Sequence, residues 1–166
     1  MSNYETISVK REGAALLFTL NRPDRRNAVS LKMMAEIIKA VSDAEDDADS
    51  RAIILYGGPD YFSAGADLTE AVKVKTATDG TRYFKHWHAL NSALEHSSKP
   101  VIAAIEGFCM TGGLELALAA DLRVAGEGAT FAITSARIGT VAGAGGTQRL
   151  PRVVGIANAL DMLFAA

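Results

Sequence analysis

The stretch GFCMTGGLELALAADLRVAG, Gly107–Gly126, decides how this chain folds. The residues on both sides of Glu115 are apolar at every position of a helical turn, which predicts a buried helix. Two glycines, Gly112 and Gly113, stand directly before this helix, and a short strand pattern, DLRVAG, follows it. A carboxylate inside such a helix has to be explained either by chemistry or by a structural partner.

The composition is that of an ordinary globular protein, and we expect one domain over residues 1–166. Of the 166 residues, 49% are hydrophobic and 22% are charged, and the net charge is -2. This charge gives no indication of a nucleic-acid partner or an anionic membrane partner. The single cysteine, Cys109, excludes a disulfide framework and a cysteine-based zinc site. Because no signal peptide and no membrane-spanning run is visible, we expect a cytoplasmic protein.

Strand and helix patterns alternate along the chain, which favours an α/β fold with substantial parallel pairing. Strands are expected as a hairpin within residues 4–20 and over residues 51–57, 101–107, 121–126 and 130–133. Helices are expected after the cap Ser30, from about Asp79 to His96, after the glycine pair, and at the end of the chain. The segments 58–68 and 139–146 are predicted to be turn-rich loops.

Glu115 is the strongest candidate for chemistry. Burial raises the pKa of a carboxylate, whereas the start of a helix favours its charged form. A carboxylate whose pKa lies near neutrality suits general acid–base catalysis. The structural alternative is an ion pair with an arginine such as Arg123 or Arg137.

The glycines indicate how a ligand could approach the same helix. A helix start exposes backbone N–H groups, and Gly112 and Gly113 leave room for a carbonyl oxygen that becomes an oxyanion. The alternative is close packing of the helix on a sheet. A second glycine loop, FSAGADL, from Phe62 to Leu68, could supply another N–H donor, with Asp67 as a helix cap.

Other motifs are less informative. The loop NRPDRRN holds three arginines, Arg22, Arg25 and Arg26, which suit phosphate groups but also occur in solvated loops. The sequence has no phosphate-binding GxxxxGK[ST] motif, and GAGGTQ does not fit the dinucleotide-binding pattern. His86 and His88 are two residues apart and cannot form a metal pair on one helix face.

Taken together, four segments resemble the crotonase family, the enoyl-CoA hydratase/isomerase superfamily. They are NRPDRRNAVS (21–30), FSAGADL (62–68), KPVIAAIEGFCMTGGLELALAADLRVAG (99–126) and RIGTVAGAGGTQRLPRVVG (137–155). The resemblance implies a spiral of repeated β-β-α units that binds an acyl-coenzyme A thioester. It also implies that no metal or redox cofactor is needed, coenzyme A being part of the substrate.

The resemblance implies roles for named residues. The thioester oxygen is expected between the backbone N–H groups of Ala64 and Gly112, with Glu115 one turn further on. Arg26 and Ala28 are expected to line the coenzyme A groove. The adenine and pantetheine path is expected to follow three neighbouring residues, namely Ala66, Asp67 and Leu68.

Two departures from the family pattern affect the expected reaction. Hydratases of this family use a second glutamate, and Ser135 in FAITSARIG takes its place. The chain also stops at Ala166, whereas family members continue into helices that help to build a trimer or hexamer. We therefore expect the C-terminal helical region to be missing and, if it is present in a longer chain, a homotrimer or hexamer.

Two classes of function follow from the sequence. The first is an enzyme that hydrates or dehydrates a 2-enoyl thioester, shifts its double bond, or carries out another enolate reaction. The second is a binder of acyl-coenzyme A without catalytic activity. Retention of Glu115 in an apolar helix favours the enzyme, because a binder could lose this desolvated carboxylate without penalty.

Overall fold

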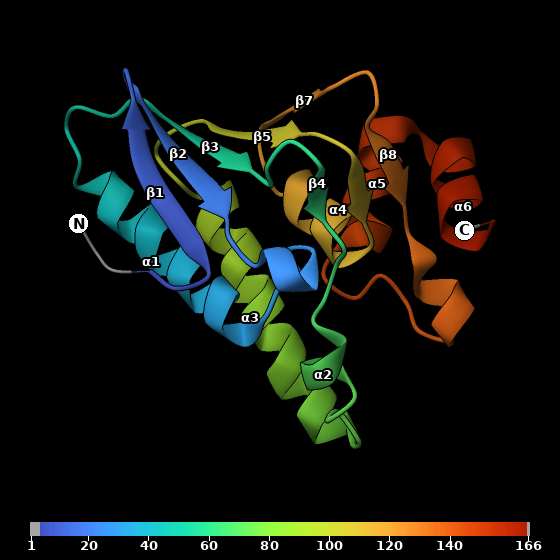
Figure 1. Cartoon of the computed structure of the whole chain (residues 1–166). Coiled ribbons are helices and arrows are strands. Elements are labelled where there is room, and N and C mark those ends of the chain that lie inside the picture. Colours follow the sequence, from blue (N-terminus) through green and yellow to red (C-terminus); the bar gives the residue numbers. More distant parts are fainter. Residues whose placement is uncertain (1–3, 166) are drawn as a thin grey trace.

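The computed structural model describes residues 4–165, and its larger sheet contains five strands, which are labelled in Figure 1. These strands are β1 (Ile7–Glu12), β2 (Ala15–Leu20), β3 (Ala52–Tyr56), β5 (Val101–Ile105) and β7 (Leu122–Ala125), in the order β1-β2-β3-β5-β7. The β1–β2 hairpin is antiparallel and all other neighbours are parallel. The predicted hairpin and the predicted parallel pairing are both confirmed.

A second sheet has three short parallel strands in the order β4-β6-β8. They are β4 (Tyr61–Ser63), β6 (Phe108–Met110) and β8 (Thr130–Ala132). The prediction of a loop over residues 58–68 is wrong for β4, and β6 was not predicted at all. Because each of these strands has three residues, none shows an alternation long enough to be recognised in the sequence.

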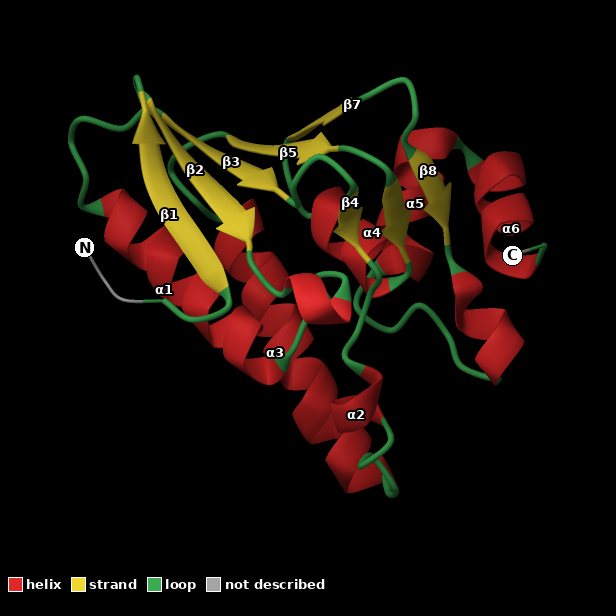
Figure 2. Ribbon diagram, in the orientation of Figure 1, coloured by secondary structure: helices red, strands yellow, loops and turns green. Residues whose placement is uncertain are grey.

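The two sheets together form the expected spiral. A strand of the larger sheet, a strand of the smaller sheet and a helical segment follow one another three times, beginning at β3, β5 and β7. In Figure 2 the smaller sheet stands beside the end of the larger one, and helices cover the face below both sheets. The α/β class and the spiral of β-β-α units are confirmed.

Two long helices, α1 (Leu31–Glu45) and α3 (Ala77–Glu95), pack against each other below the larger sheet (Figure 2). The predicted cap is confirmed, since the Ser30 hydroxyl accepts the N–H of Met33 at 3.2 Å. Thr76 and Asp79 form a capping box at the start of α3. The apolar face of α1, which includes Met34, Ile37 and Val41, is buried.

The helix of the decisive stretch, α4, runs over Gly112–Leu118, and all seven of its residues are buried. Gly113 explains how it packs, because a Cβ atom there would lie 2.7 Å from the Cβ of Ser63 on β4. For Gly113 the packing explanation is therefore the correct one. This close approach fixes the start of α4 against the smaller sheet.

The remaining helical segments surround the spiral. They are η1 (Pro23–Arg25), α2 (Leu68–Ala71), η2 (Thr134–Ile138), α5 (Gly146–Val154) and α6 (Ile156–Phe164). Apolar side chains on and near the last elements stay exposed, among them Ile138, Val141, Ile156 and Phe164. Within residues 4–165, no helix is both long and apolar enough to cross a membrane.

Candidate functional site

Glu115 lies in the first turn of α4 and is only 3% exposed. Its Oε1 atom accepts the backbone N–H of Gly146, at the start of α5, at 2.8 Å. Burial raises the pKa of Glu115 to about 7, although the amides of Gly146 and Ala144 and the charge of Arg149 act in the opposite direction. The carboxyl group is therefore poised to change its charge near neutral pH.

Neither of the two arginines suggested by the sequence pairs with Glu115. Arg123 instead donates to the carbonyl groups of Ala117 and Ala120 at the end of α4. Arg137 lies on η2, with an exposed side chain and no ion pair within residues 4–165. The structural ion-pair explanation is thus contradicted, and the glycine-rich loop before α5 holds the carboxylate with backbone amides.

Gly112 brings the start of α4 next to the second glycine loop. A Cβ atom on Gly112 would lie 2.9 Å from the amide nitrogen of Ala66 and 2.9 Å from the ring of Trp87. A Cβ atom on Gly65 would lie 3.2 Å from the amide nitrogen of Gly112. The backbone of residues 65–66 therefore lies directly against the start of α4.

Two backbone N–H groups remain unused at this junction. Within the part of the chain that the structure describes, neither the Ala66 amide nor the Gly112 amide donates to a protein acceptor. Unused amides that lie close together are suited to an oxyanion. Glu115 follows Gly112 by three residues on the same helix.

Ala64 does not fit the role expected of it. Its amide donates to the carbonyl of Arg26 at 3.0 Å and is not available to a ligand. Gly65 has a φ of 107°, a conformation that L-residues rarely adopt, and the chain turns there. Because of this turn, Ala64 faces the arginine loop while the amide of Ala66 lies beside Gly112. The Ala64 amide is therefore not a free donor, whereas the Ala66 amide has no acceptor within residues 4–165.

Asp67 is occupied by structural contacts. Its Oδ1 atom accepts the N–H of Thr69 at 2.9 Å, as expected of a cap, and its Oδ2 atom pairs with Arg22 at 2.8 Å. Burial raises the pKa of Asp67, but the hydrogen bonds from Thr69 and Arg22 outweigh it, and the pKa lies below its usual value. Asp67 thus ties the arginine loop to α2, and its carboxylate is not free to bind a ligand.

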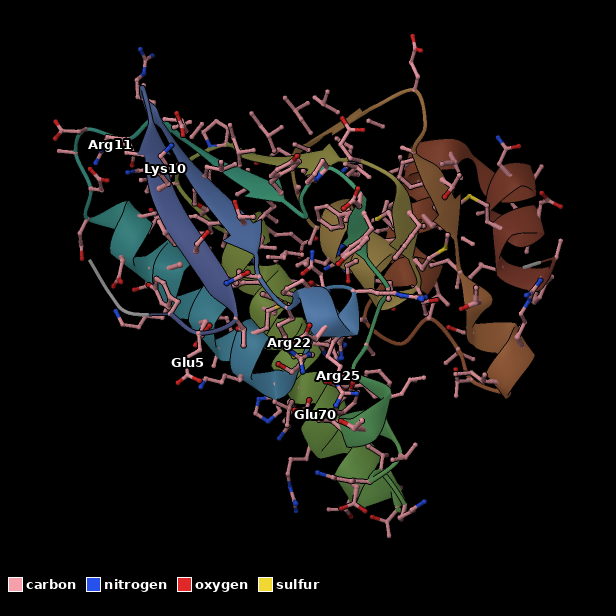
Figure 3. All side chains as sticks on the ribbon, viewed as in Figure 1. Glu5, Lys10, Arg11, Arg22, Arg25 and Glu70 are labelled. Atoms are coloured by element: carbon pink, nitrogen blue, oxygen red, sulfur yellow. The ribbon has the colours of Figure 1, made fainter. Side chains whose placement is uncertain are left out.

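The arginine loop divides into a half-buried and an exposed part. Arg22 is held by Asp67, whereas Arg25 and Arg26 are exposed. Figure 3 shows Arg22 and Arg25 near Glu70, where the arginine loop meets α2. The side chain of Ala28 is half-buried beside this loop, and Leu68, at the start of α2, is 60% exposed.

Asn27, which the sequence analysis did not single out, fastens this loop to the two sheets. Its φ is 53°, and its side-chain amide donates to the carbonyl of Gly57 at 2.6 Å and to that of Phe62 at 3.2 Å. The informative feature in the sequence was an asparagine within a charged loop, since asparagine tolerates the left-handed conformation.

Ser135 is buried on η2 and is 4% exposed. Its carbonyl accepts the N–H of Thr140 at 3.0 Å, and no protein partner for its hydroxyl is found among residues 4–165. The preceding residue, Thr134, bonds to Thr111 at the start of α4. The position of the Ser135 hydroxyl opposite Glu115 stays a prediction.

The side of α3 that faces the junction is aromatic. Trp87 is 1% exposed and its ring abuts Gly112. One turn earlier, the Tyr83 hydroxyl is buried without a hydrogen-bond partner of good geometry within residues 4–165. His88 is exposed and lines a separate surface pocket of about 500 Å³ with Arg149 and Arg152. This pocket lacks Glu115 and the two unused amides, and His88 does not join the candidate site.

The enoyl-CoA hydratase/isomerase family model matches residues 10–166 of the chain. The chain belongs to the enoyl-CoA hydratase/isomerase family. Two relatives illustrate the similarity. A mitochondrial enoyl-CoA hydratase of Pongo abelii is 39% identical over 167 residues, which are 98% of this chain and 56% of that protein. A peroxisomal Δ(3,5)-Δ(2,4)-dienoyl-CoA isomerase of Arabidopsis thaliana is 34% identical over 180 residues, 100% of this chain and 65% of that protein.

Two solved structures agree with the fold. An enoyl-CoA hydratase from Bacillus anthracis superposes with a TM-score of 0.90 at 34% identity, covering 98% of this chain and 63% of that one. DspI from Pseudomonas aeruginosa gives a TM-score of 0.91 at 32% identity, covering 99% and 67%. The chain thus spans about three fifths of the length of several relatives that it matches.

Proposed function

We propose that residues 1–166 form the acyl-coenzyme A-binding core of an enzyme that stabilises the enolate of an acyl-coenzyme A thioester, with hydration or dehydration of a 2-enoyl thioester as its reaction. One observation carries this proposal. The unused amides of Ala66 and Gly112 lie together at the start of the helix that holds Glu115, whose pKa is about 7. Family membership supports the choice of substrate class.

The two amides supply the electrostatic part of catalysis. When a nucleophile adds to the β-carbon of an enoyl thioester, negative charge accumulates on the thioester oxygen. Two fixed N–H donors stabilise this charge, and each is worth roughly 3 kcal/mol in comparable sites. The donors need no rearrangement during the reaction, because the Ser63–Gly113 packing and the Gly65 turn already fix them.

Glu115 supplies the proton transfer. In its charged form it takes a proton from water as the oxygen attacks the β-carbon, and the thioester becomes an enolate. In its protonated form it then returns a proton to the α-carbon, and the carbonyl reforms. The Gly146 amide holds Oε1, which leaves Oε2 for the substrate. One carboxyl group thereby completes the cycle and is regenerated.

The exposed arginines support binding of the coenzyme A nucleotide. Arg26→Ala is expected to lower the affinity for acyl-coenzyme A about fivefold, which is the range of an exposed ion pair. The affinity for acyl-pantetheine should stay unchanged. Only acyl-coenzyme A carries the nucleotide phosphates, so the loss of affinity caused by Arg26→Ala should become smaller at high salt. Lys10→Ala is the control, since it removes the same charge from β1, distant from Arg22 and Arg25 in Figure 3. Calorimetric titration measures both affinities, and equal losses for the two ligands would remove Arg26 from the groove.

Ser135 limits hydration in the proposed mechanism. If the Ser135 hydroxyl faces the β-carbon, Ser135→Glu restores a carboxylate pair. The rate of crotonyl-coenzyme A hydration should then rise on the order of tenfold, which is less than the roughly hundredfold rate gain that an optimised acid–base group provides. The position is buried, so Ser135→Gln is the control for added volume without a titrating proton. The loss of the enoyl absorbance measures the rate. Strong native hydration that survives Ser135→Ala would contradict the assignment.

A double-bond shift is the second candidate reaction. It is favoured because, of the two buried carboxyl groups near the junction within residues 4–165, Asp67 is paired with Arg22 and Glu115 is not in an ion pair. A single base can remove a proton from one carbon and return it to another. Its test is a 3-enoyl thioester in deuterated buffer, followed by NMR. Formation of the 2-enoyl isomer without a 3-hydroxyacyl product would replace hydration by isomerisation.

The decisive experiment compares turnover with binding. Native protein is incubated with 2-enoyl and 3-enoyl thioesters of several chain lengths beside calorimetric titration of the same ligands. We expect turnover of at least one thioester. Tight binding without turnover of any of them would favour the non-catalytic acyl-coenzyme A binder.

Three further expectations stay predictions. They are catalysis without a metal or redox cofactor, a cytoplasmic location, and a homotrimer or hexamer of a chain that includes the C-terminal helices. The exposed apolar side chains of Ile138, Val141, Ile156 and Phe164 support the last of these, because such residues are usually covered in a stable assembly.

A further inference from the structure

Thr111, the residue before Gly112, has an unusual backbone conformation. Its φ is 44° and its ψ is -111°, and it is one of three non-glycine residues with a positive φ within residues 4–165. For a β-branched residue this is a true outlier, because Cβ and its substituents crowd the backbone. Such a conformation persists only where the surroundings enforce it, and it is often found at functional sites.

Three hydrogen bonds hold Thr111 in this conformation, and all come from the segment that leads to Ser135. The Thr111 amide donates to the carbonyl of Ala132 at 2.8 Å. The Thr111 hydroxyl oxygen accepts the amide N–H of Thr134 at 3.1 Å, and the two hydroxyl groups are 2.8 Å apart. Thr134, at the start of η2, thus binds the side chain of Thr111, whereas Ala132, at the end of β8, binds its backbone.

The conformation of Thr111 sets the direction of the Gly112 amide. Because the peptide bond is planar, rotation about ψ of Thr111 turns the whole Thr111–Gly112 peptide unit. One side of this unit is the Thr111 carbonyl, which accepts the N–H of Glu115 at 2.9 Å. The other side is the unused N–H of Gly112. A relaxed Thr111 would therefore turn this donor away from its present direction beside Ala66.

We propose that Thr134 is a positioning residue, which acts through Thr111 to aim the Gly112 N–H at the thioester oxygen. This inference rests on the proposed function. It assigns a role to a residue that touches no reacting atom and stands on a different segment from both amide donors. A merely structural role would change stability in proportion to the lost hydrogen bonds, whereas a positioning role depends on the strain at residue 111.

Glycine at position 111 removes both the strained conformation and the hydroxyl that Thr134 contacts, so the activity of Thr111→Gly separates the two roles. For glycine the conformation of Thr111 is the mirror image of a common extended one and is reached without strain. In a Thr111→Gly background the peptide unit should keep its direction without help from Thr134. The effect of removing the Thr134 hydroxyl should therefore depend on which residue occupies position 111.

The test is a double-mutant cycle on the enoyl thioester that the native chain turns over. Thr134→Val, which keeps the shape and removes the hydroxyl, is expected to lower kcat roughly tenfold or more, a fraction of the loss of a whole donor. KM and the affinity for free coenzyme A should stay unchanged. Thr134→Ser should restore kcat, and Thr130→Val, on exposed β8, is the matched control. Thr111→Gly alone should keep most of the native kcat although it loses both hydrogen bonds to Thr134, and Thr134→Val should have no further effect in that background.

Two results would overturn the inference alone: an unchanged kcat in Thr134→Val, or a kcat of Thr111→Gly that is as low as that of Thr134→Val. A second measurement keeps this separate from the proposed function. Native protein should bind acetoacetyl-coenzyme A, which readily forms an enolate, more tightly than free coenzyme A. A native chain that shows neither this preference nor turnover would overturn the proposed function, and the inference with it.

Discussion

Glu115→Gln should lower turnover by at least about a hundredfold, the lower range for the loss of a general acid–base group. The amide keeps the shape of the carboxyl group, and its oxygen can still accept the Gly146 N–H. Ligand affinity should be kept or improved, because the oxyanion donors are untouched. Steady-state kinetics and calorimetric titration of the same thioester measure the two effects separately.

The same variant makes a prediction about stability and pH. Burial raises the pKa of Glu115 from 4.5 to about 7, so the folded protein favours the protonated carboxyl. Keeping Glu115 charged in the folded protein therefore lowers the free energy of unfolding. This loss is absent below pH 4.5, grows as the pH rises to about 7, and is complete above that pH. It amounts to about 3 kcal/mol at most. Glu115→Gln should therefore raise the free energy of unfolding at pH 8 and leave it unchanged at pH 4.

Urea denaturation at the two pH values measures this difference. A large loss of stability in Glu115→Gln at pH 8 would show that the charged carboxylate has a structural partner, and it would contradict the catalytic assignment. In the native protein kcat/KM should rise with pH through about 7, as the base loses its proton. The residual activity of Glu115→Gln should not show this rise of kcat/KM with pH.

Gly112→Ala is expected to reduce turnover about a hundredfold or more, which corresponds to the loss of one oxyanion donor. The added Cβ atom would lie 2.9 Å from the Ala66 amide nitrogen, where it would crowd an oxygen bound to this amide as we propose. The same atom would meet the ring of Trp87 at 2.9 Å, so Gly112→Val, with its larger side chain, would disturb the fold more. The alanine variant is therefore the better test.

Two other glycines serve as controls for this prediction. Gly80→Ala, on α3, should be harmless or slightly stabilising, because its Cβ atom would meet only Val74 at 3.8 Å. Gly113→Ala should reduce stability, since its Cβ atom would lie 2.7 Å from Ser63. Thermal unfolding beside kinetics distinguishes the three variants. Full activity in a well-folded Gly112→Ala protein would contradict the role of this amide.

The sequence predicted the α/β class, the hairpin, the long helices and the burial of Glu115, because each has a strong local pattern. The apolar surroundings of Glu115 and the cap at Ser30 are visible in a few residues. The order of family motifs then predicted the spiral. What could not be predicted were the three-residue strands β4 and β6, whose pairing depends on partners far away in the chain.

The donor pair shows another limit of sequence analysis. Ala64 and Ala66 are two residues apart in one loop, and nothing in their identity tells which amide is free. The outcome depends on the turn at Gly65 and on a carbonyl of the arginine loop that already occupies Ala64. The partner of Glu115 could not be predicted either, since Gly146 is 31 residues away and offers only its backbone.

The two edges of the larger sheet differ in a way that affects how the protein behaves at high concentration. On the β1 edge, exposed charged side chains such as Lys10 and Glu12 discourage pairing with another strand. On the β7 edge, Leu122 and Val124 are 58% and 62% exposed. An open edge with apolar side chains is a template for edge-to-edge association. Edge-to-edge association of this chain should therefore begin at β7, and Val124→Lys is the substitution that would suppress it.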